Sequence, residues 1–305
     1  MMGEVIKNIE PNRIQMKSQI SQYIFKEGLD IEIEIIPLAS LITEQKKVIT
    51  VPHRTEFYHV FWFQKGKPTH IIDFEKIKTE PNSLLFINKG RINLFDLESD
   101  YDGKVLIFTD NFFCKAESDK KYLQKTILFN DLLDVPSIDL TTASPQLITI
   151  FEAIERELQN PFDQFKADIV RQLLHSFLLL ADREKRKQGF REIKKNADFD
   201  YTLLFKDLME LQFTHNKTVG KYAAQMTITE KRLNQATTNV LGISPKQLID
   251  ERVILEAKRL LAYTNDSIKE ICYAIGFEEP TNFIKYFRKH TQTTPVEFRE
   301  QFRLD

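Results

Sequence analysis

The last hundred or so residues of the chain repeat one pattern at a spacing of 49 or 50 residues. Apolar or small residues match in register along the two copies: Val219 with Ile268, Ala223 with Cys272, Met226 with Ile275, Ile228 with Phe277, Leu233 with Phe283, Thr237 with Phe287 and Leu248 with Phe298. The offset changes from 49 to 50 once, between Ile228 and Leu233, where a loop between helices tolerates an insertion. A repeat of this length predicts two copies of one supersecondary structure.

Each copy predicts a short amphipathic helix, a turn and a second helix. We expect these helices at 218–225 and 230–240 in the first copy, and at 267–275 and 281–290 in the second. Two helices joined by a short turn form a helix-turn-helix unit, whose second helix can enter the major groove of DNA. The pattern therefore predicts two such units.

Turn and cap residues support the predicted boundaries. Gly276 lies in the turn of the second unit, where a positive φ costs little, whereas Thr227 occupies the same place in the first unit less favourably. Gly242 follows the first recognition helix as a C-cap. Ser244 is expected to cap a long connecting helix over 245–262, which has proline at its first position.

The stretch SPKQLIDERVILEAKRLLAYTNDSIKEICYAIGFEEPTNFIKYFRKHTQTTPVEFRE resembles the signature half of the AraC-type (AraC/XylS) transcriptional regulators. Those proteins carry two helix-turn-helix units joined by one long helix, here 218–241 and 267–290. The matching residues are Arg252, Ala257 and Leu261 on the connector, Ile268 and Ile271 before Gly276-Phe277, the pair Phe283 and Phe287, and Thr294-Pro295 with Phe298-Arg299. Gln292 and Thr237 depart from the family, which often has glycine and an aromatic residue there.

Helical spacing turns one side of each second helix outward, and these outward residues are the candidates for DNA contact. They are Lys231, Asn234, Gln235 and Thr238 on the first helix, and Thr281, Asn282, Lys285 and Arg288 on the second. The resemblance adds Pro280 as a matching outward position. Asn and Gln can read adenine, and Lys or Arg can read guanine. Lys289 is expected to contact phosphate, which positions a protein without specifying sequence.

The alternative is that these polar side chains only form a solvated helix face. From Asp200 to Asp305 there are 15 Lys or Arg and 14 Asp or Glu, a net charge of +1. This balance is less basic than that of a typical DNA-binding domain. We therefore expect modest DNA affinity for one subunit, so that tight binding requires a homodimer.

The first half of the chain predicts short strands. Phe57–Gln64 and Thr69–Phe74 are expected to form a hairpin around the turn at 65–68, and further strands extend the pattern over about 30–110. The segments PHRTEFYHVFWFQKGKPTHIIDF and EPNSLLFINKGRINLF resemble the cupin-like β-barrel that often precedes the AraC-type module. The expected fold class is α+β, with a cupin-like barrel and helices followed by an all-α domain of two helix-turn-helix units on a long helix.

Helices follow the strands, at about 145–182. One stripe on the second of them has residues three or four positions apart: Phe165, Ile169, Leu173, Phe177 and Leu180. This stripe serves either the core or contact with a second copy. Seven Lys or Arg then lie within 183–195, which is typical of a solvated linker. The predicted domains are therefore 1–182 for effector binding and dimerisation, a linker at 183–199, and 200–305 for DNA binding.

A small effector could bind in the mouth of the predicted barrel. The candidate residues are His53, Phe57, His59, Trp62 and Asn93. The alternative is that the histidines are hydrogen-bonded barrel residues and the aromatic residues form the core. Metal-binding cupins resemble this region, but Thr55, His59 and Asn93 stand where they have His, Glu and His. We therefore expect no metal and no cofactor.

Composition excludes several enzyme classes. The nine glycines lie at least 13 residues apart, so no glycine-rich phosphate loop exists. No GxSxG or HExxH motif occurs, and we expect a protein without catalytic activity. No wholly apolar run exceeds five residues, the length of Phe177–Ala181, and Cys114 and Cys272 lie far apart. These features favour a cytoplasmic protein with no membrane contact.

Together these features predict a sequence-specific DNA-binding transcriptional regulator. The resemblance implies an activator that binds double-stranded DNA as a homodimer, responds to a small effector and contacts RNA polymerase. One alternative is a cupin-type enzyme with a helical appendage. Another is an effector-independent regulator whose barrel only dimerises or binds a protein.

Overall fold

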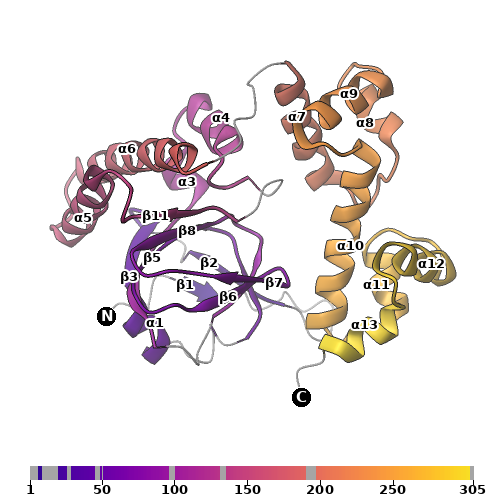
Figure 1. The fold of residues 1–305 in the computed structure, drawn as a ribbon, viewed down its shortest axis with the longest axis horizontal. Coiled ribbons are helices and arrows are strands. Elements are labelled where there is room, and N and C mark those ends of the chain that lie inside the picture. Colours follow the sequence, from indigo (N-terminus) through magenta and orange to yellow (C-terminus); the bar gives the residue numbers. More distant parts are fainter. Residues whose placement is uncertain are drawn as a thin grey trace. The chain divides into compact units, whose positions relative to one another are not determined.

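The computed structural model of the chain describes residues 6–8, 20–25, 29–44, 49, 51–95, 100–130, 135–189 and 197–302. The chain forms two compact units, which we call the sheet unit (Met1–Glu10 and Ser21–Arg191) and the helical unit (Pro11–Ile20 and Glu192–Asp305). Figure 1 shows that strands belong to the first unit and that the second contains helices. The α+β fold class is thereby confirmed.

Two sheets form the sheet unit. The six-stranded sheet contains, in spatial order, β1 (Ile6–Asn8), β2 (Ser21–Phe25), β4 (His53–Thr55), β9 (Ile92–Leu94), β6 (Thr69–Ile72) and β7 (Glu75–Lys78). The five-stranded sheet contains β11 (Ser137–Asp139), β8 (Ser83–Ile87), β5 (Tyr58–Lys65), β10 (Asp102–Phe108) and β3 (Ile33–Pro37). β2 and β4 pair in parallel, and the other recorded pairs are antiparallel. Among the described strands the two sheets remain separate rather than closing into one barrel.

Strand β5 is buried on both faces, because its alternating side chains belong to two different cores. Tyr58, Val60 and Trp62 pack in the core that contains the helices. Phe61 and Phe63 pack in the second core, with residues from both sheets. This double burial explains why the strand reads as a nearly continuous apolar run.

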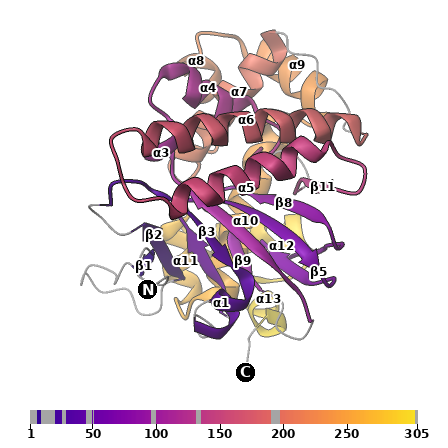
Figure 2. The same ribbon diagram turned by 90° about the vertical axis from the view of Figure 1, so that its left-hand side faces the viewer.

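Helices cover one side of the five-stranded sheet. α5 (Pro145–Gln159) and α6 (Lys166–Lys187) pack side by side over it, as Figure 2 shows. The centres of the Trp62 ring and the Phe151 ring of α5 are 5.3 Å apart. The Phe151 ring in turn lies 5.7 Å, centre to centre, from the Phe177 ring of α6. The shorter helices of this unit are α1 (Leu38–Glu44), α3 (Asp110–Phe113) and α4 (Glu117–Lys125).

The predicted hairpin of Phe57–Gln64 with Thr69–Phe74 is wrong. Both segments form strands, but β5 pairs with β8 and β10, whereas β6 pairs with β7 and β9. The turn at 65–68 therefore carries the chain from one sheet to the other. Gly66, with φ of +78°, makes this crossing.

Helix α6 runs past residue 182, where the predicted helical region ends. It begins at Lys166 because Asp163 turns the chain just before it, accepting hydrogen bonds from the amides of Phe165 and Lys166. It continues to Lys187, so the first part of the predicted linker 183–199 is helical. Glu184 is buried there and bonds Lys187 at 2.8 Å. Residues 190–196 of that linker lie outside the described residues.

Within the predicted stripe of α6, burial differs along the helix. Phe177 is fully buried, and Leu173 and Leu180 are half-buried against the core. Phe165 and Ile169 are exposed, because Val170 and Leu174 take the inward positions at that end of the helix. The stripe therefore does not serve the core along its whole length.

The helical unit contains seven helices within 197–302. They are α7 (Ala197–Gln212), α8 (Val219–Gln225), α9 (Glu230–Leu241), α10 (Pro245–Tyr263), α11 (Ile268–Ala274), α12 (Pro280–Thr291) and α13 (Pro295–Phe302). Helix α10 contacts α9, α11, α12 and α13. Across the described parts of the chain, every helix is too short or too polar to cross a lipid bilayer.

The turns of the two repeats have the same backbone geometry. Thr227 and Gly276 both have positive φ, of 57° and 79°. The C-caps of α9 and α12, Gly242 and Gln292, also have positive φ, of 76° and 65°. At Gly276 a Cβ atom would lie 1.6 Å from the carbonyl oxygen of Thr214, whereas none of the neighbouring atoms comes within 4 Å at Gly242. Of these two glycines, only Gly276 would combine left-handed backbone strain with a close contact if it carried a side chain.

We predict that Gly276→Ala lowers the free energy of unfolding by about 3 kcal/mol, the sum of left-handed strain and overpacking. Gly242→Ala is the matched control and should cost only about 1 kcal/mol, from strain alone. Chemical denaturation of the full chain, followed by circular dichroism, measures both. Equal losses for the two variants would contradict the packing of the Gly276 turn against Thr214.

Candidate nucleic-acid interface

Helix α9 is anchored by its cap and by three small or apolar residues. The Thr229 hydroxyl accepts a hydrogen bond from the Arg232 amide at 3.1 Å, which begins the helix. Leu233, Ala236 and Thr237 are completely buried beneath it, as the spacing predicts. Thr237 occupies the position where the AraC-type family usually has an aromatic residue.

Asp198 of α7 holds α9 from one side. Its carboxylate accepts a hydrogen bond from the Asn239 amide at 2.7 Å and pairs with the Arg232 guanidinium at 2.5 Å. These hydrogen bonds, Asn239 first, lower the pKa of Asp198. The Arg232 guanidinium also lies 4.7 Å from the centre of the Tyr201 ring. The Arg232 side chain thus packs against α7, whereas the side chain of the neighbouring Lys231 faces solvent.

Helix α12 is held by aromatic packing and by one buried carboxylate. Phe283 and Phe287 are completely buried. On the adjacent face, the Tyr286 hydroxyl donates a hydrogen bond of 2.6 Å to Asp250 of α10. Burial, and then Asp250 itself, raise the pKa of Tyr286, so this proton stays in place. Lys246 pairs with the same carboxylate at 2.5 Å.

These anchors leave polar faces outward on α9 and α12. The predicted residues that are exposed are Lys231, Asn234, Gln235, Thr238, Thr281, Asn282, Lys285, Arg288 and Lys289. Pro280 is half-buried at the first position of α12. Val240, near the end of α9, is also half-buried. Side chains suited to base or phosphate contact therefore lie on the solvent side of both helices.

Charge is unevenly distributed along this surface. Arg288, Lys289 and His290 lie in the last turn of α12, where cations also stabilise the negative end of the helix dipole. His290 lies 3.8 Å from Asp250. Lys231, in the first turn of α9, and Lys285, in the middle of α12, are exposed cations at earlier positions.

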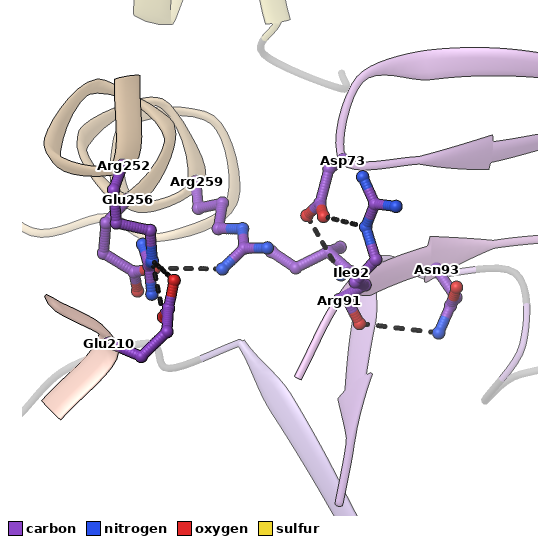
Figure 3. A network of polar contacts seen from close by, with 8 residues as sticks. All are labelled: Asp73, Arg91, Ile92, Asn93, Glu210, Arg252, Glu256 and Arg259. Carbon is purple, nitrogen blue, oxygen red and sulfur yellow. Dashed lines mark hydrogen bonds and ion pairs between the residues drawn. The ribbon is translucent and has the colours of Figure 1, made fainter. Parts of the chain in front are cut away.

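A second polar network joins α7 to α10, and the sequence did not reveal it. Arg252 bonds both oxygens of Glu210 at 2.8 and 3.0 Å and reaches Glu256 at 3.1 Å, while Arg259 also contacts Glu256, as Figure 3 shows. The Arg252 guanidinium lies 4.0 Å from the Phe213 ring centre. Arg252 was one of the residues that carried the family resemblance, and it fixes the first helix of the unit to the connector.

Lys217 links the two repeats. Its ammonium group donates to the carbonyl of Thr214 at 2.9 Å and to that of Gly276 at 3.0 Å. It also lies 4.8 Å from the Phe277 ring centre. Partial burial lowers the pKa of Lys217. No sequence motif marks this residue, because its partners are backbone carbonyls, and that of Gly276 lies 59 residues away along the chain.

In the sheet unit, a cavity lies between the two sheets. His53, Phe57 and His59, three of the five predicted effector residues, line it. Trp62 points to the opposite face of β5 and packs on Phe151, so it lies outside this cavity. Asn93 pairs across the strands with His53 and is buried, but does not line the cavity.

Asn93 lies two residues after Arg91, which forms an ion pair with Asp73. Figure 3 shows Arg91 bonded to Asp73 at 2.8 Å, and the Asp73 carboxylate also accepts from the Ile92 amide at 3.1 Å. The Asn93 amide donates to the Arg91 carbonyl at 3.4 Å. Within the described residues, no cluster of three or more His, Cys, Asp or Glu side chains is arranged to hold a metal ion.

Comparison with known proteins assigns the helical unit. The family profile described as a helix-turn-helix domain matches residues 222–301. The HTH-type transcriptional regulator YisR of Bacillus subtilis is 28% identical over 92 residues, covering 30% of this chain and 32% of YisR. The lactose operon transcription activator of Staphylococcus xylosus is 28% identical over 110 residues, covering 36% and 38%. The activator RhaS of Escherichia coli is 25% identical over 155 residues, covering 51% and 52%. The matches thus span between about a third and about half the length of these relatives.

Solved structures are also similar. ToxT of Vibrio cholerae, with bound unsaturated fatty acid, is 17% identical over 89% of this chain and 92% of its own, with a TM-score of 0.42. A regulator from Chromobacterium violaceum with an AraC-type DNA-binding domain is 27% identical, covering 35% of this chain and 96% of its own, with a TM-score of 0.32. The assignment rests on the sequence matches to the helical unit. The chain thus carries a C-terminal helix-turn-helix domain that is similar in sequence to those of AraC-type transcriptional regulators.

Proposed function

We propose that the chain binds double-stranded DNA in a sequence-specific manner and regulates transcription as an activator. The observation that carries this proposal is the pair of exposed polar faces on α9 and α12, two helices that pack on one connector. The S. xylosus and E. coli relatives are named as activators, which favours that sign of regulation here. An activator on DNA would also contact RNA polymerase.

Each exposed residue has a role that follows from its chemistry. Asn234, Gln235 and Asn282 would read adenine through paired hydrogen bonds, and Lys231 and Lys285 would reach guanine. Residues with hydroxyl groups or positive charge toward the helix ends would contact phosphates and so fix the position of the protein along the duplex. They are Thr238, Thr281, Arg288 and Lys289. Pro280 would fix the start of α12 and its contact with the groove wall.

The sheet unit would serve as the sensor. We propose that a small effector binds in the cavity lined by His53, Phe57 and His59, with Asn93 beside them and Trp62 in the supporting core. An effector acts only if it binds one arrangement of the protein better than another. Residues 1–182 would therefore bind effector and dimerise, 183–199 would connect, and 200–305 would bind DNA.

A homodimer would compensate for the weak net charge of the helical unit. The exposed face of α6 has residues alternately four and three positions apart: Phe165, Ile169, Gln172, Ser176, Leu179 and Arg183. This spacing suits helix pairing with a second copy. In an antiparallel pair, the acidic start of one helix, with Asp163 and Asp168, would lie beside the basic end of the other. We propose this face as the dimer contact.

The DNA-binding proposal predicts that the chain loses DNA affinity when two exposed cations are removed. A binding site is first selected from random duplex DNA with the full chain. Lys231→Ala/Lys285→Ala should then weaken binding to that site by about 2 kcal/mol or more and reduce its salt dependence. Fluorescence anisotropy measures both. Lys76→Ala/Lys78→Ala removes the same charge from exposed positions of β7 and should leave affinity unchanged. Unaltered binding by the first double variant at physiological salt would contradict the assignment.

The dimer proposal predicts dissociation when charge enters the α6 face. Ile169 and Leu179 are 43% and 56% exposed, so Ile169→Glu/Leu179→Glu should fold and sediment as a monomer. The matched control is Leu211→Glu, at a residue of α7 that is 79% exposed, which should sediment like the unaltered chain. Sedimentation velocity distinguishes the species. A dimer that survives the double substitution would place the contact elsewhere.

A further inference from the structure

The cavity in the sheet unit has a mixed lining. Its empty space, part of it open to solvent, is about 410 Å³. Seven of its side chains are apolar: Ile36, Leu41, Ile49, Phe57, Phe95, Val105 and Ile107. The other four are Tyr23, His53, Thr55 and His59, from β2, β4 and β5. Ligand sites in proteins commonly combine an apolar wall with a few polar groups in this way.

One polar atom in this lining lacks a partner. His59 is only 5% exposed, and its Nδ1 atom makes no hydrogen bond within the described structure. A buried polar atom of this kind costs free energy unless a ligand or water satisfies it. Phe57 and Phe61 flank the ring, at 5.0 and 5.7 Å between ring centres. The histidine therefore presents hydrogen-bonding capacity inside an otherwise aromatic surrounding.

The second histidine has a fixed proton. His53 Nδ1 lies 3.0 Å from the Val51 carbonyl oxygen, which only accepts hydrogen bonds. Nδ1 therefore carries the hydrogen, and in the neutral ring Nε2 is left as an acceptor. A ligand with a hydroxyl or N–H group can satisfy such an acceptor. A hydroxyl also suits His59 Nδ1 in either tautomer, because it both donates and accepts.

Among the residues that the structure describes, the cavity lining holds no positive charge. It contains no Lys or Arg, and burial lowers the pKa of His59 to about 3 and also lowers the pKa of His53. Both imidazoles are thus neutral at physiological pH. Glu34 pairs across the sheet with Ile107, a lining residue, so its carboxyl points to the same face. A carboxylate ligand would lose its hydration without meeting a cation in this described lining.

We propose that this cavity binds a small uncharged molecule that joins an apolar body to one hydroxyl or N–H group, and that it rejects carboxylates. The apolar body packs on Ile36, Val105 and Ile107, and the polar group bonds the imidazoles of His53 and His59. The inference deepens the proposed sensor role by naming the ligand class. Ligand binding to the cavity can be measured without DNA. Only the regulatory meaning of this binding therefore rests on the proposed sensor role.

Matched pairs of small molecules test the charge requirement. The full chain, with labelled Ile, Leu and Val methyl groups, is titrated with phenol or benzoate and with 1-hexanol or hexanoate at pH 7.5. The methyl signals of Ile36, Val105 and Ile107 should shift and saturate with the alcohols. Affinity for each carboxylate should be lower by about 100-fold or more, because the anion is buried unpaired. Carboxylates that bind as tightly as the alcohols, or no saturable binding by any of the four, would overturn the proposal.

Substitutions then locate the site and its polar anchor. His59→Phe removes one hydrogen bond and should weaken phenol binding about threefold to tenfold. Val105→Phe fills the cavity and should abolish it. Tyr58→Phe changes the opposite face of β5 and is the matched control, which should bind phenol normally. Unaltered affinity in both His59→Phe and Val105→Phe, with folding verified by circular dichroism, would refute the site.

DNA binding by the same protein separates the two proposals. Protein that selects a DNA site but fails the small-molecule titration refutes the ligand class and leaves the regulator intact. Protein that binds the alcohols but selects no DNA supports the cavity and refutes the regulator.

Discussion

Helix α10 is the constraint on which the helical unit depends. Its buried residues lie on more than one face, and it contacts α9, α11, α12 and α13. Charged side chains reinforce this apolar packing. Arg252 donates hydrogen bonds to Glu210 of α7, and Asp250 accepts a hydrogen bond from Tyr286 of α12. A helix of 19 residues is about 28 Å long, somewhat shorter than the roughly 34 Å of one turn of B-DNA. In the proposed function, this one helix would space α9 and α12 for neighbouring major grooves.

The helical unit could be predicted from sequence because local chemistry determines most of it. The repeat shows where the two copies lie. Single residues then mark the helix ends: Ser244 and the following proline begin α10, and Gly242 and Gly276 have the positive φ that ends a helix. Each of these signals acts on residues only a few positions away. The predicted helices agree with the structure to within about one residue at their ends. The outward faces of α9 and α12 follow from spacing alone. What DNA they read is a proposal that rests on those faces.

The sheet unit was predicted less well, because strand pairing depends on contacts distant along the chain. Residues 57–64 and 69–74 alternate like the strands of a hairpin, yet their ladders belong to different sheets. Trp62 and Phe61 are adjacent aromatics that face different cores, and only the sheet topology decides which one approaches the cavity. The basic run after 183 reads as linker, but a buried Glu184 keeps its beginning helical.

The central claim is that one subunit engages two successive major grooves through α9 and α12. Protection of guanine N7 from dimethyl sulfate, on a DNA site selected by the full chain, tests it most directly, because N7 lies in the major groove. The account predicts two clusters of protected guanines for each bound subunit, about 10 base pairs apart on one face of the duplex. Substitution at Asn282 and Lys285 should remove one cluster and leave the other. A single cluster per subunit, or protection unchanged by those substitutions, would contradict the account.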